Sequence, residues 1–457
     1  MISAQQVVEL ALAAAATSAR CDESIVIVSD RAEASLRWAG NSMTTNGVST
    51  SQTTAVISIV RKGDTAHIGA RRSSIVDQGA VAALVAASAD AAHAAPDAGD
   101  NAPLLTGSGE PADWDDPVPG TGVGAFAAVA RALSVGFGGS DRLYGYAHHV
   151  VETTFLATST GVRRRFTQPT GSVEINAKRG TASAWAGVST PWFIDVPIDA
   201  MLDGLSTRLG WARRTVDLPA GRYETLMPPS TVADMMIYLG WSMDGRGAEE
   251  GRTALSAPGG GTRVGEKLTD LALTMYSDPF APGQECAPFV HTASGSERIS
   301  LFDNGMGIDR VDWIRDGTIS SLTYPRAAAV EFGTAPAVPA DNLLMTGGTA
   351  SLPEMVAATE RGLLLTTLWY IRTVDPTTLL LTGLTRDGVY LIEDGQVTAA
   401  VNNFRFNESP LDLLRRATEA GIAEATLPRE WGDWATRAVM PTLRIPDFHM
   451  SSVSQAQ

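Results

Sequence analysis

The apolar and polar positions in the first half of the chain form two similar patterns, each with three β-strand candidates separated by polar turns that contain glycine. Gly47 and Gly161 are nearly as far apart as Gly63 and Gly180, and such a near-constant offset is typical of an internal duplication. Two unrelated meanders with similar turns are the alternative. The expected strands are Glu33–Ala39, Thr53–Val60 and Thr65–Gly69 in the first unit, and Val151–Ala157, Ser172–Ala177 and Ala182–Gly187 in the second.

Helical spacing of apolar residues predicts helices around these two units. They are expected at Ala4–Ala19 and Asp77–Ala94 on either side of the first unit, and at Gly124–Leu133 before the second. Residues 96–120 are rich in Pro, Gly and Asp, which favours a linker. The predicted organisation is residues 1–95 as a first α/β unit, 96–120 as the linker, 121–205 as a second α/β unit, and 206–457 as a C-terminal domain.

The last part of the chain contains short strand candidates with Gly or Asp turns between them. This spacing predicts a β-rich, barrel-like C-terminal domain with a few helices. Because strands and helices do not alternate regularly, the predicted class is α+β. The strand candidates are Leu271–Met275, Val311–Ile314, Leu379–Leu384 and Val389–Ile392.

One helix of this domain has an unusually apolar pattern. Pro228-Pro229-Ser230-Thr231 is typical of a helix start, with hydroxyl side chains able to cap free N–H groups. An apolar stripe with helical spacing then runs from Val232 to Met243. Ile237 and Trp241 widen the stripe, so the helix is expected to be buried on most sides.

Short motifs follow this helix in a fixed order. They are Gly265-Glu266-Lys267-Leu268, Phe302-Asp303-Asn304-Gly305, Asn342-Leu343-Leu344-Met345, Tyr390-Leu391-Ile392-Glu393-Asp394-Gly395 and Pro441-Thr442-Leu443-Arg444-Ile445. Each motif is weak alone, but together with the helix and its flanks they resemble the TldD/PmbA family over most of the chain. The resemblance implies a metallopeptidase-related protein.

The resemblance also implies which branch of the family is present. In the catalytic TldD branch the apolar helix carries a His-Glu-x-x-x-His zinc motif, and its places fall here on Ile237, Tyr238 and Ser242. Neither Ile nor Ser is a plausible zinc ligand in such a site, and Tyr cannot replace the Glu as a carboxylate base. The Cys ligand that precedes the final strand in that branch is absent from Arg429–Trp434. The chain resembles the TldE (PmbA) branch, which implies no catalytic residue, no metal of its own, and a buried helix at the former zinc-site position.

Composition narrows the possible partners. The net charge of −15 over 457 residues argues against nucleic acid, whose phosphates would repel the chain. The most apolar run, Leu363–Ile371, is shorter than the ~20 residues that a membrane span needs. Cys21 and Cys286 do not form a disulfide framework, and the N-terminus lacks the charge pattern of an export signal. A cytoplasmic, soluble protein is therefore expected.

Other residues could carry chemistry of their own. His148 and Glu152 can share one face of a predicted strand, whereas His149 must point to the other face. Cys286 and His291, with Asp278 and Asp303, form another ligand-like group, although solvated loop residues are the simpler interpretation. The glycines at 120, 122 and 124 lack the preceding strand of a dinucleotide site, and the acidic stretch 113–116 reads as solvated linker more readily than as a docking patch.

Three functional hypotheses follow. The leading one is a non-catalytic subunit that forms a hetero-oligomer with a TldD-type zinc subunit, and the complex degrades or trims unfolded peptides. The resemblance places the zinc in the partner. The second hypothesis is a peptidase active alone, through His148 and Glu152 or through Cys286 and His291. The third is a free-standing peptide-binding or regulatory module.

Overall fold

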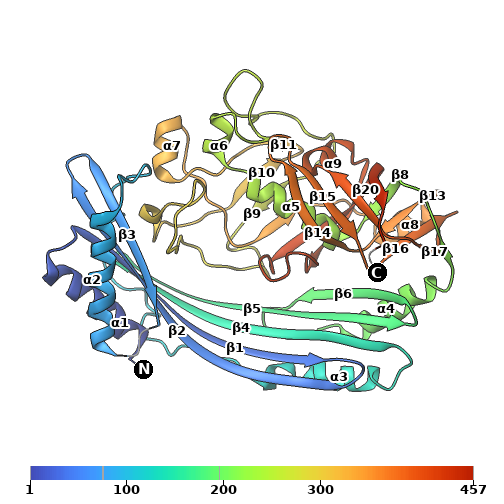
Figure 1. Ribbon diagram of the computed structural model, residues 1–457, viewed down its shortest axis with the longest axis horizontal. Coiled ribbons are helices and arrows are strands. Elements are labelled where there is room, and N and C mark those ends of the chain that lie inside the picture. Colours follow the sequence, from blue (N-terminus) through green and yellow to red (C-terminus); the bar gives the residue numbers. More distant parts are fainter. Residues whose placement is uncertain (1, 75–76, 195, 456–457) are drawn as a thin grey trace.

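The chain folds into two bodies built on separate β-sheets. The computed structural model describes residues 2–74, 77–194 and 196–455. A long, curved N-terminal sheet lies along one side, and a β-rich C-terminal body packs above it in the view of Figure 1. The mixture of helices and antiparallel strands confirms the predicted α+β class.

The N-terminal sheet has six antiparallel strands in the order β3-β2-β1-β4-β5-β6. Each predicted unit supplies three consecutive strands, and the first strands of the two units, β1 and β4, pair at the centre. The two units therefore share one sheet. The strands are β1 Glu23–Trp38, β2 Met43–Lys62, β3 Thr65–Ser73, β4 Arg142–Thr158, β5 Arg163–Arg179 and β6 Ala182–Ser189.

The turn between β1 and β2 does not lie where the sequence predicts it. The chain turns at residues 39–42, where Gly40 and Asn41 have φ values of 60° and 68°. Residues 46–48, expected to form a loop, continue β2 instead and pair with β1. The prediction was wrong because a strand exposed on both faces has the polar composition of a loop. The predicted turn at Gly63, with φ 60°, is confirmed.

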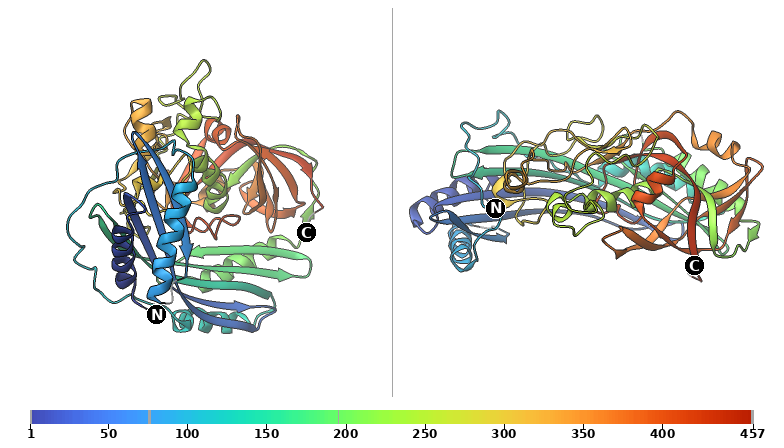
Figure 2. Two further views of the ribbon diagram at one scale, coloured as in Figure 1. Left: turned by 60° about the vertical axis from the view of Figure 1, so that its left-hand side comes forward. Right: turned by 90° about the horizontal axis from the view of Figure 1, so that it is seen from above.

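Helices cover the two ends of the sheet. Helices α1 Ala4–Ser18 and α2 Gln78–Ala94 pack at one end, where Ser3 forms a capping box with Gln6 and Asp77 caps α2. Figure 2 shows this helix pair against the sheet. At the other end lie η1 Val123–Phe126, α3 Ala127–Gly136 and α4 Ile198–Trp211. The sequence patterns did not reveal α4, which crosses the boundary predicted between residues 205 and 206.

The segment predicted to be a linker, residues 96–120, is anchored to the sheet at a few positions. Leu104 is buried in one core cluster, and Trp114 is buried in another with its ring 5.3 Å from that of Phe155. Asp113 forms an ion pair of 2.9 Å with Arg165. The segment is therefore anchored to the sheet at these residues, whereas residues 106–110 and 115–120 are exposed. The anchoring was not predicted because its few apolar residues are spaced without any period.

The C-terminal body is organised around β20, which pairs with β8, β12, β18 and β19. Its largest core cluster contains most of α5. The strands are β7 Thr215–Val216, β8 Gly221–Met227, β9 Met275–Ser277, β10 Val311–Arg315, β11 Thr318–Ile319, β12 Leu343–Met345, β13 Arg361–Leu365, β14 Leu368–Asp375, β15 Leu380–Thr385, β16 Val389–Glu393, β17 Gln396–Val401, β18 Phe404–Glu408, β19 Glu419–Thr426 and β20 Ala438–Val453. The helices are α5 Pro229–Ser242, α6 Gly245–Glu249, η2 Leu301–Asp303, α7 Arg326–Phe332, α8 Leu352–Ala357 and α9 Pro410–Arg416.

Helix α5 begins and ends close to the predicted positions, and most of its first three turns are buried. The hydroxyl groups at its start do not cap it, however. Thr231 Oγ1 donates to the carbonyl of Pro228, and Ser230 Oγ donates to the carbonyl of Leu427. Among the described helices, none has the length and hydropathy that crossing a bilayer would require.

Candidate functional site

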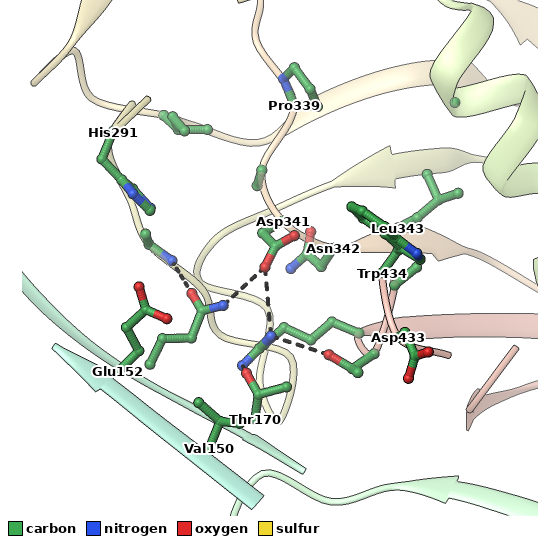
Figure 3. Close-up of a pocket in the computed structure, with 18 of the residues that line it drawn as sticks. Val150, Glu152, Thr170, His291, Pro339, Asp341, Asn342, Leu343, Asp433 and Trp434 are labelled. Carbon is green, nitrogen blue, oxygen red and sulfur yellow. Dashed lines mark hydrogen bonds and ion pairs between the residues drawn. The ribbon is translucent and has the colours of Figure 1, made fainter. Parts of the chain in front are cut away.

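A cavity of about 810 Å³ lies between the N-terminal sheet and the C-terminal body. Strands β1, β4 and β5 form one wall with alternate side chains, as the two-residue period of a strand requires. The opposite wall comes from α5 and from residues 287–308, 339–343 and 432–437. Figure 3 shows side chains from both bodies pointing into this space.

The three positions where the resemblance places a zinc motif do not converge on the cavity. Ile237 lines it and is only 4% exposed. Tyr238 is directed into the body, where its hydroxyl donates to the carbonyl of Ile371 at 2.6 Å, and burial raises the pKa of this phenol. Ser242 Oγ donates to the carbonyl of Tyr238 at 2.8 Å. An aliphatic group, a buried phenol and a bonded hydroxyl therefore occupy these places.

Three of the other candidate ligands do meet at the cavity. His148 and Glu152 extend from β4 and His291 from the opposite wall, and Figure 3 shows Glu152 and His291 on the two sides. His149 points to the other face of the sheet, as expected, where its ring contacts Thr121 Oγ1 at 2.7 Å and the Pro191 carbonyl at 2.8 Å. No set of three or more His, Cys, Asp or Glu side chains in the described part of the chain is placed to hold a metal ion.

The Cys286 group is dispersed. Cys286 is 1% exposed in a small apolar cluster, and burial raises the pKa of its thiol to about 12. A thiol with such a pKa stays protonated at neutral pH, which makes it a poor nucleophile and metal ligand. Asp303 is buried against Arg326 at 2.7 Å, and Asp278 accepts from the Phe280 N–H. The structure therefore does not assemble the Cys286, His291, Asp278 and Asp303 group.

The charged groups on the β1 and β4 wall neutralise one another. Arg31 lies 3.4 Å from Glu152 and 3.1 Å from Glu33, and His148 Nε2 lies 2.9 Å from Glu33. Burial opposes ionisation of Glu33, but the contacts with His148 and Arg31 outweigh it and lower the pKa of this carboxyl. Glu152 is thus held by a cation and is not a free general base.

Asp341 and Arg437 join the two bodies at the edge of the cavity. Asp341 accepts a hydrogen bond of 2.9 Å from Gln168 of β5, whose Oε1 accepts from the Ala287 N–H. Arg437 lies 3.7 Å from Asp341 and also donates to Thr170 Oγ1 and to the carbonyl of Glu285. These contacts, several of which are drawn in Figure 3, hold the sheet and the C-terminal body together.

Arg298 and His291 are two further titratable side chains of the cavity. Arg298 takes part in no ion pair among the described residues, and its buried Nε has no hydrogen-bond partner. Burial lowers the pKa of its guanidinium, while Asp244 acts in the opposite direction. Burial also lowers the pKa of the His291 imidazole, although Glu152 and Asp341 act in the opposite direction, and the lower pKa favours the neutral form at neutral pH.

The loop before β20 is fixed against α5 by a buried acid. Asp234 is 0% exposed, and its Oδ1 accepts from the Glu430 N–H at 3.0 Å. Burial raises the pKa of this carboxyl well above its ordinary range, although its backbone hydrogen bonds act against the rise. Trp431 packs edge-on against Tyr238 and Trp241. Sequence reasoning missed Asp234, whose only signal was a single acid within an apolar helix.

Comparison with known proteins gives a consistent result. Residues 220–452 match the family model described as the PmbA/TldA metallopeptidase C-terminal domain. The structure is similar to that of TldE from Thermococcus kodakarensis, with 15% identity and a TM-score of 0.78 over 97% of this chain and 99% of that chain. It is also similar to a putative modulator of DNA gyrase from Bacteroides thetaiotaomicron, with 14% identity and a TM-score of 0.77 over 99% of this chain and 100% of that chain.

A third similar structure is a putative modulator of a DNA gyrase from Thermotoga maritima, with 13% identity and a TM-score of 0.76 over 98% of this chain and 100% of that chain. No curated protein sequence matches the chain. At such low sequence identities, the similar structures establish only that the fold is shared. The family model, in contrast, matches the sequence itself over half of the chain.

Proposed function

Because the chain belongs to the PmbA/TldD family of metallopeptidase-related proteins, we propose that it is the non-catalytic subunit of a TldD–TldE-type zinc peptidase complex. The observation that carries this proposal is the use of the three motif positions in α5. Ile237 packs at the cavity wall, and the hydroxyl groups of Tyr238 and Ser242 donate to backbone carbonyl groups.

The groups present at this helix do not fit zinc. Zinc in proteins takes thiolate, imidazole or carboxylate ligands, and Ile237 has no donor atom. The hydroxyl of Ser242 already donates to the helix backbone. The proposal therefore assigns the zinc, and the hydrolysis of the peptide bond, to a TldD-type partner subunit.

The cavity supports a role for this chain beside that partner. Its apolar groups, including Ile237 and Trp241, lie next to charged groups that are largely neutralised by one another. Such a mixed surface can accommodate peptides of varied sequence without performing chemistry on them. The substrate class proposed is unfolded peptides, which the complex degrades or trims. The proposal includes a cytoplasmic location and, since the chain carries a net charge of −15, no nucleic-acid partner.

Co-expression with a homologue that carries the His-Glu-x-x-x-His motif tests this function. We expect a stable complex that contains zinc and cleaves an unfolded peptide, whereas the chain purified alone does neither. Cleavage by the chain alone would contradict the proposal. His148→Ala and His291→Ala variants would then show whether the cavity residues are responsible. Peptide binding by the chain alone, without any association with the homologue, would instead favour a free-standing binding module.

A further inference from the structure

A closed loop of the C-terminal body brings Arg298 to the cavity. The loop begins at His291, which Figure 3 shows at the cavity wall, and it ends at Asn304. The Asn304 side chain closes it, because its Oδ1 accepts from the Thr292 N–H at 2.7 Å and its Nδ2 donates to the Thr292 carbonyl at 2.9 Å. Arg298 lies in a tight turn at residues 296–299, whose two ends bond to each other through their backbones. The loop itself therefore sets the position of Arg298.

Arg298 forms no ion pair with any described residue, although acids lie near it. Glu297, its neighbour in the turn, is held by Arg252, whose Nη2 donates to both carboxylate oxygens at 3.0 and 2.9 Å. Burial lowers the pKa of the Arg298 guanidinium, and the charge of Asp244 only partly offsets this effect. The buried Nε of Arg298 also lacks an acceptor among the described residues. Since buried polar groups in folded proteins are normally bonded, Arg298 has the character of a binding site without its ligand.

The other arginines of the cavity wall already have acids beside them. Arg31 lies 3.4 Å from Glu152, and Arg437 lies 3.7 Å from Asp341. Arg298 thus differs from them, and a ligand with a single negative charge would supply its missing partner. A doubly charged group such as phosphate would be repelled more strongly by Glu152 and Asp341. A single carboxylate is therefore the better match for this cavity.

Apolar side chains line the same cavity. Ile299, Ile308 and Trp313 are among them, and Ile299 packs on the small apolar cluster that contains Ile308. A guanidinium can bind a carboxylate through two parallel hydrogen bonds, and such bonds are stronger where water is partly excluded. The cavity volume of about 810 Å³ lies within the roughly 300–1,000 Å³ of typical ligand sites. The lining thus suits a carboxylate carried by an apolar or mixed chain.

We propose that Arg298 binds a carboxylate of a peptide held in the cavity. This inference rests on the proposed function for its substrate class, unfolded peptides, and adds that the chain recognises them by a negative charge. Both the C-terminal carboxylate and an acidic side chain have the required chemistry. Binding of the terminal group would also fix the direction in which the peptide lies in the cavity.

Binding of short labelled peptides to the chain purified alone, followed by fluorescence anisotropy, tests the proposal. Three peptides share one sequence without other acids and carry the label on the N-terminus. The first ends in a leucine with a free carboxylate, the second in the amide of that leucine, and the third in the amide of a glutamate. We expect the first or the third to bind at least about 10-fold more tightly than the second, as a hydrogen bond between charged groups would give. The peptide that binds more tightly identifies the source of the carboxylate.

Substitutions assign this preference to Arg298. Arg298→Met should remove it, so that all three peptides bind as weakly as the neutral amide. Arg298→Lys should keep part of it, because the positive charge remains but the two-pronged geometry of the guanidinium is lost. Arg131→Met is the matched control, since it removes an exposed arginine of α3 outside the cavity, and it should leave the preference unchanged. Circular dichroism and thermal unfolding show whether each variant is folded.

Equal or absent binding of the three peptides, or a preference that Arg298→Met retains, would overturn the proposal. The test also separates this inference from the proposed function. If a His-Glu-x-x-x-His homologue forms an active complex with the chain but no preference for a carboxylate is found, the inference fails and the proposed function stands. If the preference depends on Arg298 but the homologue neither associates nor cleaves, the carboxylate site stands and the proposed function fails.

Discussion

Replacing Asp234 by asparagine tests the electrostatics of the helix that lacks the zinc motif. Asp234 is fully buried in α5, and its Oδ1 accepts from the Glu430 N–H. Asparagine keeps that acceptor and the shape of the side chain but has no ionisable proton. We expect Asp234→Asn to stabilise the protein at neutral and alkaline pH and to remove part of the dependence of stability on pH.

The size of this effect follows from proton linkage. Burial raises the pKa of Asp234 in the folded protein, whereas an unfolded aspartate ionises at about pH 4. Above that pH the folded state holds a proton that the unfolded state has released. The stability conferred by this proton is complete below pH 4 and is lost as the pH rises through the folded pKa. The slope is about 1.4 kcal/mol per pH unit, or about 3–6 °C in Tm for a cooperative unit of ~200 residues.

Thermal unfolding of wild type and variant at several pH values between 5 and 8 measures this slope. The difference in Tm between Asp234→Asn and wild type should grow with pH until the folded pKa is passed. Asp433→Asn is the matched control, because it removes a carboxyl from an exposed position near the same loop. Its profile should run parallel to that of wild type. Parallel profiles for Asp234→Asn and wild type would refute the assignment of a protonated Asp234.

Three further substitutions probe the cavity and the helix. Arg298→Met should raise Tm, since it replaces a partly buried cation that forms no ion pair with any described residue by an apolar side chain of similar length, and a lower Tm would reveal a partner for the guanidinium. Tyr238→Phe should cost about 0.5–1.5 kcal/mol in urea unfolding, because one buried hydrogen bond is lost while the Ile371 carbonyl keeps the donor from Arg372, and an unchanged midpoint would contradict the Tyr238 hydrogen bond. His291→Ala should leave peptide cleavage by the complex with a TldD-type subunit unchanged, and a complete loss of cleavage would place His291 in the catalytic machinery.

The sequence predicted those elements that depend on local residue spacing or on the backbone preference of single residues. The apolar spacing from Val232 to Met243 located α5, because a helix buried on most sides must be apolar at helical spacing. The turns at Gly63 and Gly180 were located because a positive φ favours glycine. Residues 46–48 were wrongly predicted as a loop, because a strand exposed on both faces lacks the alternation of apolar and polar residues that identifies a strand.

The cavity could not be predicted, because it is formed by residues far apart in the sequence. Alternation along β4 correctly placed His148 and Glu152 on one face, but nothing in the sequence showed that His291 would lie across from them. The pairing of Arg31 with Glu152 depends on strand register, which a single sequence does not specify. The roles of Trp114 and Asp234 likewise depend on distant contacts, with Phe155 and with the loop at Glu430.

The zinc content of the chain expressed alone, compared with that of the complex formed with a His-Glu-x-x-x-His homologue, tests the central claim most directly. Helix α5 contains Ile237, Tyr238 and Ser242 at the positions where the family resemblance places the zinc motif of the catalytic branch. The account predicts no stoichiometric zinc in the isolated chain, and zinc in the complex that disappears when the motif of the homologue is mutated. Stoichiometric, tightly bound zinc in the isolated chain would contradict it.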